Sequence, residues 1–142
     1  MNVGKSSGLT QNGYRLVALI TGLSVAHHVD HILRGVTGWP LDGGFNPFSA
    51  SLLVYPVIAV GVFLSRRERV GPLFWSVLAG GGALFILFVH VGPAAGDAVG
   101  DIPGQYSSPV ADVVALAILA AFFAALTAHC ILELGRLRRD DS

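Results

Sequence analysis

Four long apolar segments dominate the pattern of hydrophobic and polar positions along the chain. They cover residues 14–34, 48–65, 71–91 and 109–134, and glycine, proline and charged residues lie between them. At about 1.5 Å per residue, the second and third segments are each long enough to cross a hydrocarbon core of about 30 Å with little slack. A soluble bundle would carry a polar stripe on every helix, and the third and fourth segments carry almost none. We therefore predict an all-α integral membrane protein, a bundle of four transmembrane helices running up-down-up-down.

The polar stretches at the two ends of the chain set the limits of this domain. Residues 1–13 are rich in glycine and serine, so we expect a flexible cytoplasmic tail there. Residues 14–134 then form a single transmembrane domain, and residues 135–142 form a second cytoplasmic tail. Pro56 lies in the middle of the second segment and predicts a kink in that helix.

Composition and charge support a membrane setting. The chain has 142 residues, of which 53% are hydrophobic and only 13% are charged, whereas a soluble domain carries about 25% charged residues. The net charge is zero, so no nucleic-acid partner is indicated. The single cysteine, Cys130, cannot form an internal disulfide. We expect a multi-pass protein of the cell membrane, with the lipid bilayer as its main partner.

The lysines and arginines predict the orientation, because basic residues collect on the cytoplasmic side. With the N-terminus inside, only Arg34 lies on the outer side, and both termini are cytoplasmic (N-in, C-in). The basic residues then on the cytoplasmic side are Lys5, Arg15, Arg66, Arg67, Arg69, Arg136, Arg138 and Arg139.

Small residues mark two helix faces. Residues 79–83 read Ala-Gly-Gly-Gly-Ala, and the fourth segment carries alanines at positions 117, 121, 124, 125 and 128. Such residues let helix backbones approach closely in lipid. We expect tight packing inside the bundle; the alternative is a homo-oligomer or a larger membrane complex that forms through one of these Gly/Ala faces.

A cluster of polar residues closes the first segment, which ends Ala-His-His-Val-Asp-His-Ile-Leu-Arg. On a helix, His31 lies about 40° to one side of His27, and Asp30 lies about 60° to the other. Arg34 lies about 20° from His27, whereas His28 is about 100° away and off this face. All of these residues except His28 therefore form one polar stripe.

Two other segments bring polar residues to a similar depth. His31 lies about 24 Å along the first segment and His90 about 27 Å along the third, and both segments run outward. Asp112 returns to that level in the first turn of the fourth segment. Ionisable groups inside a bilayer are costly and are usually functional. The outer end of the bundle is therefore predicted to gather His27, His31, His90, Asp30 and Asp112.

The favoured hypothesis is a metal site with His27, His31 and His90 as ligands. Three imidazoles suit zinc, copper or iron, and a nearby carboxylate can act as a fourth ligand or orient an imidazole. An open coordination position would make the site catalytic. The residues expected to act as further ligands or to contact the ligands are Asp30, Asp112, His28 and Arg34.

Haem b is a variant of this hypothesis, with His31 (or His27) and His90 as axial ligands. The non-functional alternative is a hydrogen-bonded network, in which Asp30 and Arg34 form an ion pair and the histidines bond to loop carbonyls. Neither interpretation decides whether the protein is an enzyme.

Further alternatives stay open. The protein could be a non-enzymatic accessory subunit of a membrane complex, or a small transporter or proton relay that uses the same polar stripe. The loop 92–108 could fold over the histidines and bring Asp97, Asp101 and Tyr106 near them. A small-residue pattern ending at Ala26 also resembles a signal-peptide cleavage site. No phosphate-binding glycine loop, nucleophile elbow or Cys-x-x-Cys pair is present.

Overall fold

The computed structural model describes residues 8–37, 46–92 and 97–140, and these residues form helices joined by turns, with no strand among them. The elements are α1 (Gln11–Arg34), α2 (Pro47–Ser51), α3 (Val54–Arg66), α4 (Pro72–His90), the short 3-10 helix η2 (Val99–Asp101) and α5 (Pro109–Asp140). Most of the predicted N-terminal tail, residues 1–7, lies outside the described residues, as do residues 141–142.

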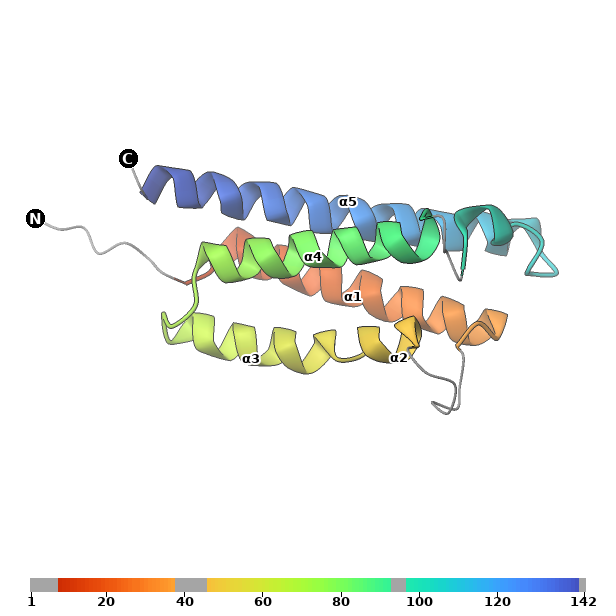
Figure 1. Ribbon diagram of the computed structural model, residues 1–142, viewed down its shortest axis with the longest axis horizontal. Helices are drawn as coiled ribbons and strands as arrows, with labels where there is room; N and C mark the ends of the chain where they lie inside the picture. The colour runs from red at the N-terminus through yellow and green to blue at the C-terminus, as the bar shows by residue number, and fades with distance from the viewer. Residues whose placement is uncertain (1–7, 38–45, 93–96, 141–142) are drawn as a thin grey trace, which may run out of the picture.

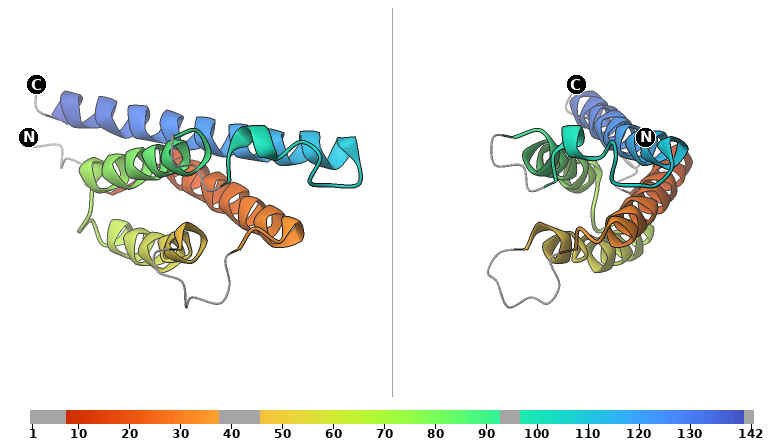
Figure 2. Two further views of the ribbon diagram at one scale, coloured as in Figure 1. Left: turned by 45° about the vertical axis from the view of Figure 1, so that its right-hand side comes forward. Right: turned by 90° about the vertical axis from the view of Figure 1, so that its right-hand side faces the viewer.

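Four helices are long and apolar enough to cross a membrane, as predicted. They are Gln11–Arg34, Pro47–Arg66, Pro72–His90 and Pro109–Arg139. Successive spans run in opposite directions, so that the two ends of the chain lie at the same end of the bundle (Figure 1). The views in Figure 2 show α5 beside both α1 and α4, which are its two most extensive contacts, whereas α3 contacts α1 less. The orientation of the bundle in the membrane stays a prediction.

Small residues let α4 pack against α5, as the sequence indicated. Ala79 and Ala83 of α4 are buried together with Ala115 and Ala125 of α5 in the main apolar core. The other alanines singled out on α5, at positions 117, 121, 124 and 128, are exposed in the single chain. The Gly/Ala faces thus serve packing in part, and oligomerisation through the exposed alanines stays a prediction.

The predicted break in the second span is present, one turn before Pro56. Helix α2 ends at Ser51 and α3 begins at Val54. Proline has no N–H group to donate to the carbonyl of Leu52, and its ring crowds that carbonyl, so the preceding turn cannot stay α-helical. Across the break, backbone N–H groups donate to the carbonyl three residues earlier, as in a 3-10 helix; Leu53 N, for example, donates to Ala50 O at 3.2 Å.

The helix ends differ from the predicted ones at both termini of the chain. Helix α1 begins at Gln11 because the Thr10 hydroxyl caps it, accepting a hydrogen bond from Gly13 N at 3.1 Å. Helix α5 continues past residue 134 to Asp140, so most of the predicted C-terminal tail is helical. Arg136 stabilises this extension, because it donates hydrogen bonds to Glu133 at 2.7 Å and to the carbonyl of Gly8 at 2.8 Å.

We expect Gly61→Val to destabilise the contact between α3 and the start of α4. A Cβ atom at Gly61 would lie 2.6 Å from Phe74 Cε1 and 3.1 Å from Trp75 Cη2. Overpacking of this kind lowers the free energy of unfolding by about 1–3 kcal/mol. The measurement is an SDS titration of the purified protein followed by tryptophan fluorescence. Gly22→Val is the control, since a Cβ atom there meets nothing within 4 Å; equal loss in both variants would contradict this packing.

Candidate metal centre

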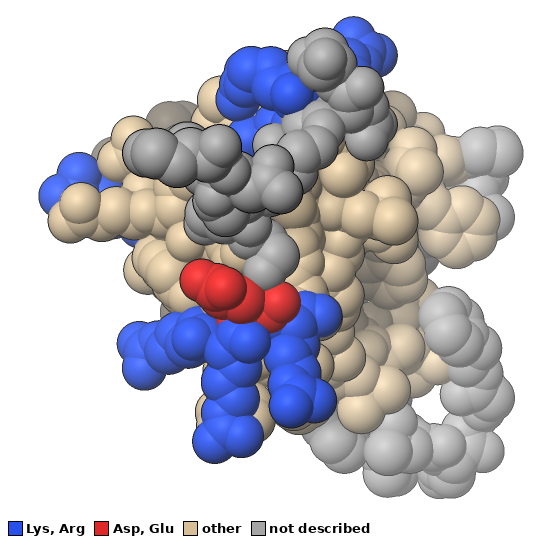
Figure 3. Space-filling view, turned by 90° about the vertical axis from the view of Figure 1, so that its left-hand side faces the viewer, with Lys and Arg blue, Asp and Glu red and all other residues tan. Residues whose placement is uncertain are grey.

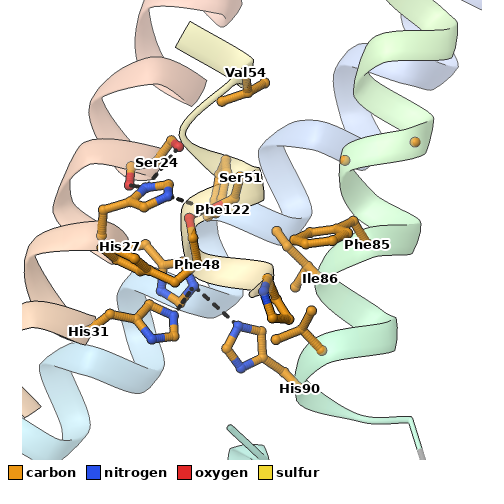
Figure 4. Close-up of a pocket in the computed structure, with 15 residues that line it drawn as sticks. Ser24, His27, His31, Phe48, Ser51, Val54, Phe85, Ile86, His90 and Phe122 are labelled. Atoms are coloured by element: carbon orange, nitrogen blue, oxygen red, sulfur yellow. Dashed lines mark hydrogen bonds between the residues drawn. The ribbon is translucent and has the colours of Figure 1, made fainter. Parts of the chain in front are cut away.

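Three imidazoles from two helices converge on one point near the end of the bundle opposite the chain termini (Figure 4). His27 and His31 lie on one face of α1, and His90 is the last residue of α4. The Nε2 atom of His27 lies 3.1 Å from that of His31 and 3.2 Å from that of His90. All three side chains are buried, and one ligand atom from each lies within 4.8 Å of the others. The three residues predicted as metal ligands are therefore grouped in space.

Loop carbonyls decide which nitrogen of two rings carries hydrogen. His31 Nδ1 lies 3.3 Å from the carbonyl of Val36, and His90 Nδ1 lies 2.6 Å from the carbonyl of Asp97. A carbonyl can only accept, so each Nδ1 donates, and in the neutral form of each ring Nε2 then presents a lone pair to His27. His27 Nε2 has at most one hydrogen to give, and it cannot satisfy both lone pairs. A cation at this point would satisfy both at once.

The two distances from His27 Nε2 to the other Nε2 atoms fit a metal ion. Zinc–nitrogen bonds of about 2.0–2.1 Å at tetrahedral angles place ligand nitrogens about 3.3 Å apart. The observed separations of 3.1 and 3.2 Å need only small adjustments to reach that value. His27 Nδ1 is buried and has no hydrogen-bond partner among the described residues, so His27 lacks the outer contact that the other two imidazoles have.

The backbone after α1 supplies one of these outer contacts. Gly35 has φ 73°, in the left-handed region that glycine adopts without strain, and it ends the helix. The chain then turns back, so that Val36 N donates to the carbonyl of His31 at 2.9 Å. This reversal places the Val36 carbonyl against the His31 ring, and it fixes the direction in which Nε2 points.

Asp97, which follows α4, lies against two of the three imidazoles. Its Oδ2 is 3.5 Å from His31 Nδ1 and 3.5 Å from His90 Nδ1. A carboxylate on the outer nitrogen of a histidine orients the ring and makes it a better metal ligand. Burial raises the pKa of Asp97, but the hydrogen bonds and the charge of Arg34 outweigh burial, and the pKa lies below its ordinary value.

Arg34 joins the carboxylates around the site. It donates to Asp97 through Nη1 at 2.6 Å and Nη2 at 2.8 Å, and to Asp30 through Nη2 at 2.8 Å. Asp30 also accepts a hydrogen bond of 2.7 Å from the hydroxyl of Tyr106. The ion pair that the network interpretation predicted is thus present. This ion pair does not involve the Nε2 atoms of the three histidines, which therefore have no cationic partner among the described residues.

The other predicted residues lie near the centre but outside it. Asp112 accepts hydrogen bonds from the backbone N–H groups of Gly104 at 3.0 Å and Tyr106 at 3.3 Å, and so holds the loop that carries Tyr106. Of the loop residues considered for a cover, Tyr106 and Asp97 reach the site, whereas Asp101 is exposed. The sequence could not separate Asp97 from Asp101, since both follow His90 in the same glycine-rich loop.

His28 makes a separate set of hydrogen bonds. Its Nε2 lies 2.7 Å from Ser51 Oγ, and its Nδ1 lies 2.9 Å from the Tyr55 hydroxyl and 2.7 Å from the carbonyl of Ser24. These contacts tie α1 to α2 and α3 across the break at residues 52–53. Polar residues at positions 51 and 55 of an otherwise apolar span indicate such a contact, but it was not predicted from the sequence.

A cavity of about 220 Å³ adjoins the three imidazoles. Its wall includes Phe85 and Ile86 of α4 and Phe122 of α5, and Figure 4 shows these side chains facing the histidines. The inward side of the cluster therefore faces a space that could admit another molecule. Comparisons of the chain with protein-family models, with curated proteins and with solved structures find no match.

Replacing Arg34 with methionine should strongly destabilise the end of the bundle that carries the histidine cluster. The Arg34 side chain is 0% exposed, and its loss would leave the carboxylates of Asp30 and Asp97 buried without a cation. Breaking a buried ion pair from one side costs about 3–5 kcal/mol. The free energy of unfolding of Arg34→Met in detergent tests this value. The exposed Arg69 is the matched control, and Arg69→Met should change stability by less than about 0.5 kcal/mol.

Proposed function

We propose that the chain is an integral membrane metalloprotein in which His27, His31 and His90 bind one transition-metal ion. The observation that carries this proposal is the convergence of three buried Nε2 atoms, two of which present lone pairs to the same point. Zinc, copper and iron all accept imidazole ligands.

The number of protein ligands favours a reaction centre over a purely structural site. Structural zinc sites use four protein ligands, whereas catalytic sites use three and keep one position for water or substrate. The nearby carboxylates of Asp30 and Asp97 bind Arg34, so the fourth position is left to the cavity. A metal ion there would acidify bound water or polarise a substrate oxygen.

The arrangement favours a single ion over haem b. Axial ligation by His31 and His90 would require a flat macrocycle between their Nε2 atoms. The His27 Nε2 atom already lies 3.1 Å from one of these atoms and 3.2 Å from the other. The three rings therefore enclose a space suited to one ion, and a porphyrin would have to displace His27.

Charge supports an extracytoplasmic position for this centre. Figure 3 looks onto the end of the bundle that holds both chain ends, and arginine side chains gather there. The exposed arginines at this end are Arg66 at the end of α3, Arg67 and Arg69 of the α3–α4 turn, and Arg138 and Arg139 of α5. By the positive-inside rule this end faces the cytoplasm, which puts the histidines in the outer half of the cell membrane.

Metal analysis of the detergent-purified protein tests the proposal. We expect about one zinc, copper or iron ion per chain in the wild type, because structural and catalytic sites of this kind hold a single ion. His31→Ala and His90→Ala should each lose most of this metal, since two imidazoles remain. Elemental analysis by mass spectrometry gives the ratio, and a Soret absorption band would indicate haem instead.

Two histidines outside the trio provide matched controls. His28→Asn and His129→Ala should keep the metal content of the wild type, because neither side chain belongs to the grouped ligand atoms. A metal-free wild type, or a metal content that no substitution in the trio changes, would contradict the proposed function.

Orientation is tested by thiol labelling of intact cells. In a Cys130→Ser background, Ser108→Cys should react with a membrane-impermeant maleimide, because the exposed Ser108 precedes α5 at the proposed outer face. Arg138→Cys, at the other end of α5, should react only after the cells are opened. The reverse pattern would place the histidines near the cytoplasmic face.

A further inference from the structure

We propose that the cavity beside the histidines binds the hydrocarbon chain of a membrane lipid, which enters sideways from the bilayer and places its oxygen-bearing end at the metal. This proposal rests on the metal centre proposed above and names the class of substrate for it. The supporting evidence is the position, length and lining of the cavity, together with the side chains that close the opposite side of the histidine cluster.

A second cavity adjoins this one along α4, towards the opposite end of the bundle. This smaller cavity of about 60 Å³ shares Ser24, Val54, Gly82 and Phe122 with the larger one. It reaches Trp75, near the start of α4. Trp75 lies about 22 Å from His90 along the axis of α4. The two cavities together therefore follow most of one transmembrane span, which is the direction in which a lipid chain lies.

The lining of this path is apolar beyond the histidines. Phe85, Ile86 and Val89 line the larger part, and Leu78 and Leu126 line the smaller part. Cavities with apolar walls stay dry or hold apolar molecules, because water finds too few hydrogen-bond partners in them. An apolar chain of small cross-section fits this space better than a polar, water-soluble substrate.

Side chains close the cluster on the side towards the predicted outer surface. Arg34 and Asp97, whose side chains are 0% and 4% exposed, pair there with each other, and Asp97 lies 3.5 Å from Nδ1 of both His31 and His90. Asp30 and Tyr106 extend this network. Among the described residues, the groups on that side are thus bonded to one another, and the cavity lies on the other side of the imidazoles.

The cavity opens towards lipid at Gly81. Gly81 lines the larger cavity, is exposed, and lies near the middle of α4, at the depth of the hydrocarbon core. A Cβ atom there would meet nothing within 4 Å. On the facing side, the wall is formed by Val54 at the start of α3. A chain can therefore pass between α3 and α4 without crossing the polar end of the bundle.

The occupant is identified by combining these features. The metal requires an oxygen or nitrogen donor on the molecule, and the path beyond it accepts only hydrocarbon. A fatty acyl chain, or a similar unbranched chain that ends in a carboxyl or hydroxyl group, satisfies both requirements. The bilayer that surrounds the opening at Gly81 is the source of such molecules.

The test uses the full-length protein loaded with Co²⁺, whose visible spectrum reports on a new ligand at the metal. Octanohydroxamate is the probe with a chain, and acetohydroxamate is the probe without one. In the wild type, we expect the spectrum to change at an octanohydroxamate concentration about tenfold or more below that for acetohydroxamate. Gly81→Leu should lose this advantage, because misfit by even a few carbon atoms in an apolar pocket changes binding by roughly 10- to 200-fold.

Gly22→Leu is the matched control, because Gly22 is exposed on α1 outside the cavity and has free space around it. It adds the same side chain and leaves partition of the probe into detergent unchanged, so it should behave as the wild type. Val54→Phe narrows the cavity from the side of α3, with the exposed Val57→Phe as its control. This second pair keeps the test decisive if Gly81→Leu does not fold.

The outcomes separate the two proposals. The lipid-chain site alone is overturned if the variants bind Co²⁺ normally and a cavity variant prefers octanohydroxamate as strongly as its control does. The two comparisons are Gly81→Leu with Gly22→Leu, and Val54→Phe with Val57→Phe. Equal responses to both hydroxamates in the wild type also overturn it and indicate a water-soluble substrate. Failure of the wild type to bind Co²⁺ overturns the metal centre, and the lipid-chain site with it.

Discussion

A guanidinium buried between two carboxylates holds together the end of the bundle that carries the histidine cluster. Arg34 extends from the end of α1 and binds Asp97, which follows α4, so one side chain fixes the distance between the two helices that carry the histidines. Removing such charges from water is costly, and only the close geometry of both ion pairs compensates for that cost. The convergence of His27 and His31 with His90 depends on this connection.

Much of the fold follows from the sequence because lipid imposes simple rules on it. Spans must be long, apolar and helical, since every backbone hydrogen bond has to be made within the segment. For the same reason, Pro56 could be expected to interrupt its helix. The helical end of α5 was missed, because its residues are polar; it depends on the contact between Arg136 and Gly8, which lie at opposite ends of the chain.

The histidine trio was also predictable, since helical periodicity sets His27 beside His31 and the depth of His90 follows from its place along α4. Of the contacts outside the trio, the ion pair between Asp30 and Arg34 was predicted, whereas the contact of Asp97 with two imidazoles could not be deduced from periodicity. Asp97 reaches the cluster through a loop, and no periodic rule places a residue in a loop. Asp30 lies on the same helix face as the histidine ligands, but its carboxylate accepts hydrogen bonds from Arg34, one turn further along α1.

The second span is attached to the rest of the bundle at its two ends. Near α2, Tyr55 contacts His28, and at the opposite end the Trp75 indole donates a hydrogen bond of 2.8 Å to Ser65. Between these two attachments, α3 presents apolar side chains and lies alongside its neighbours with few polar contacts. The middle of α3 can therefore bend outward without breaking a hydrogen bond to another helix, so the passage beside it can widen while both ends of the span stay in place.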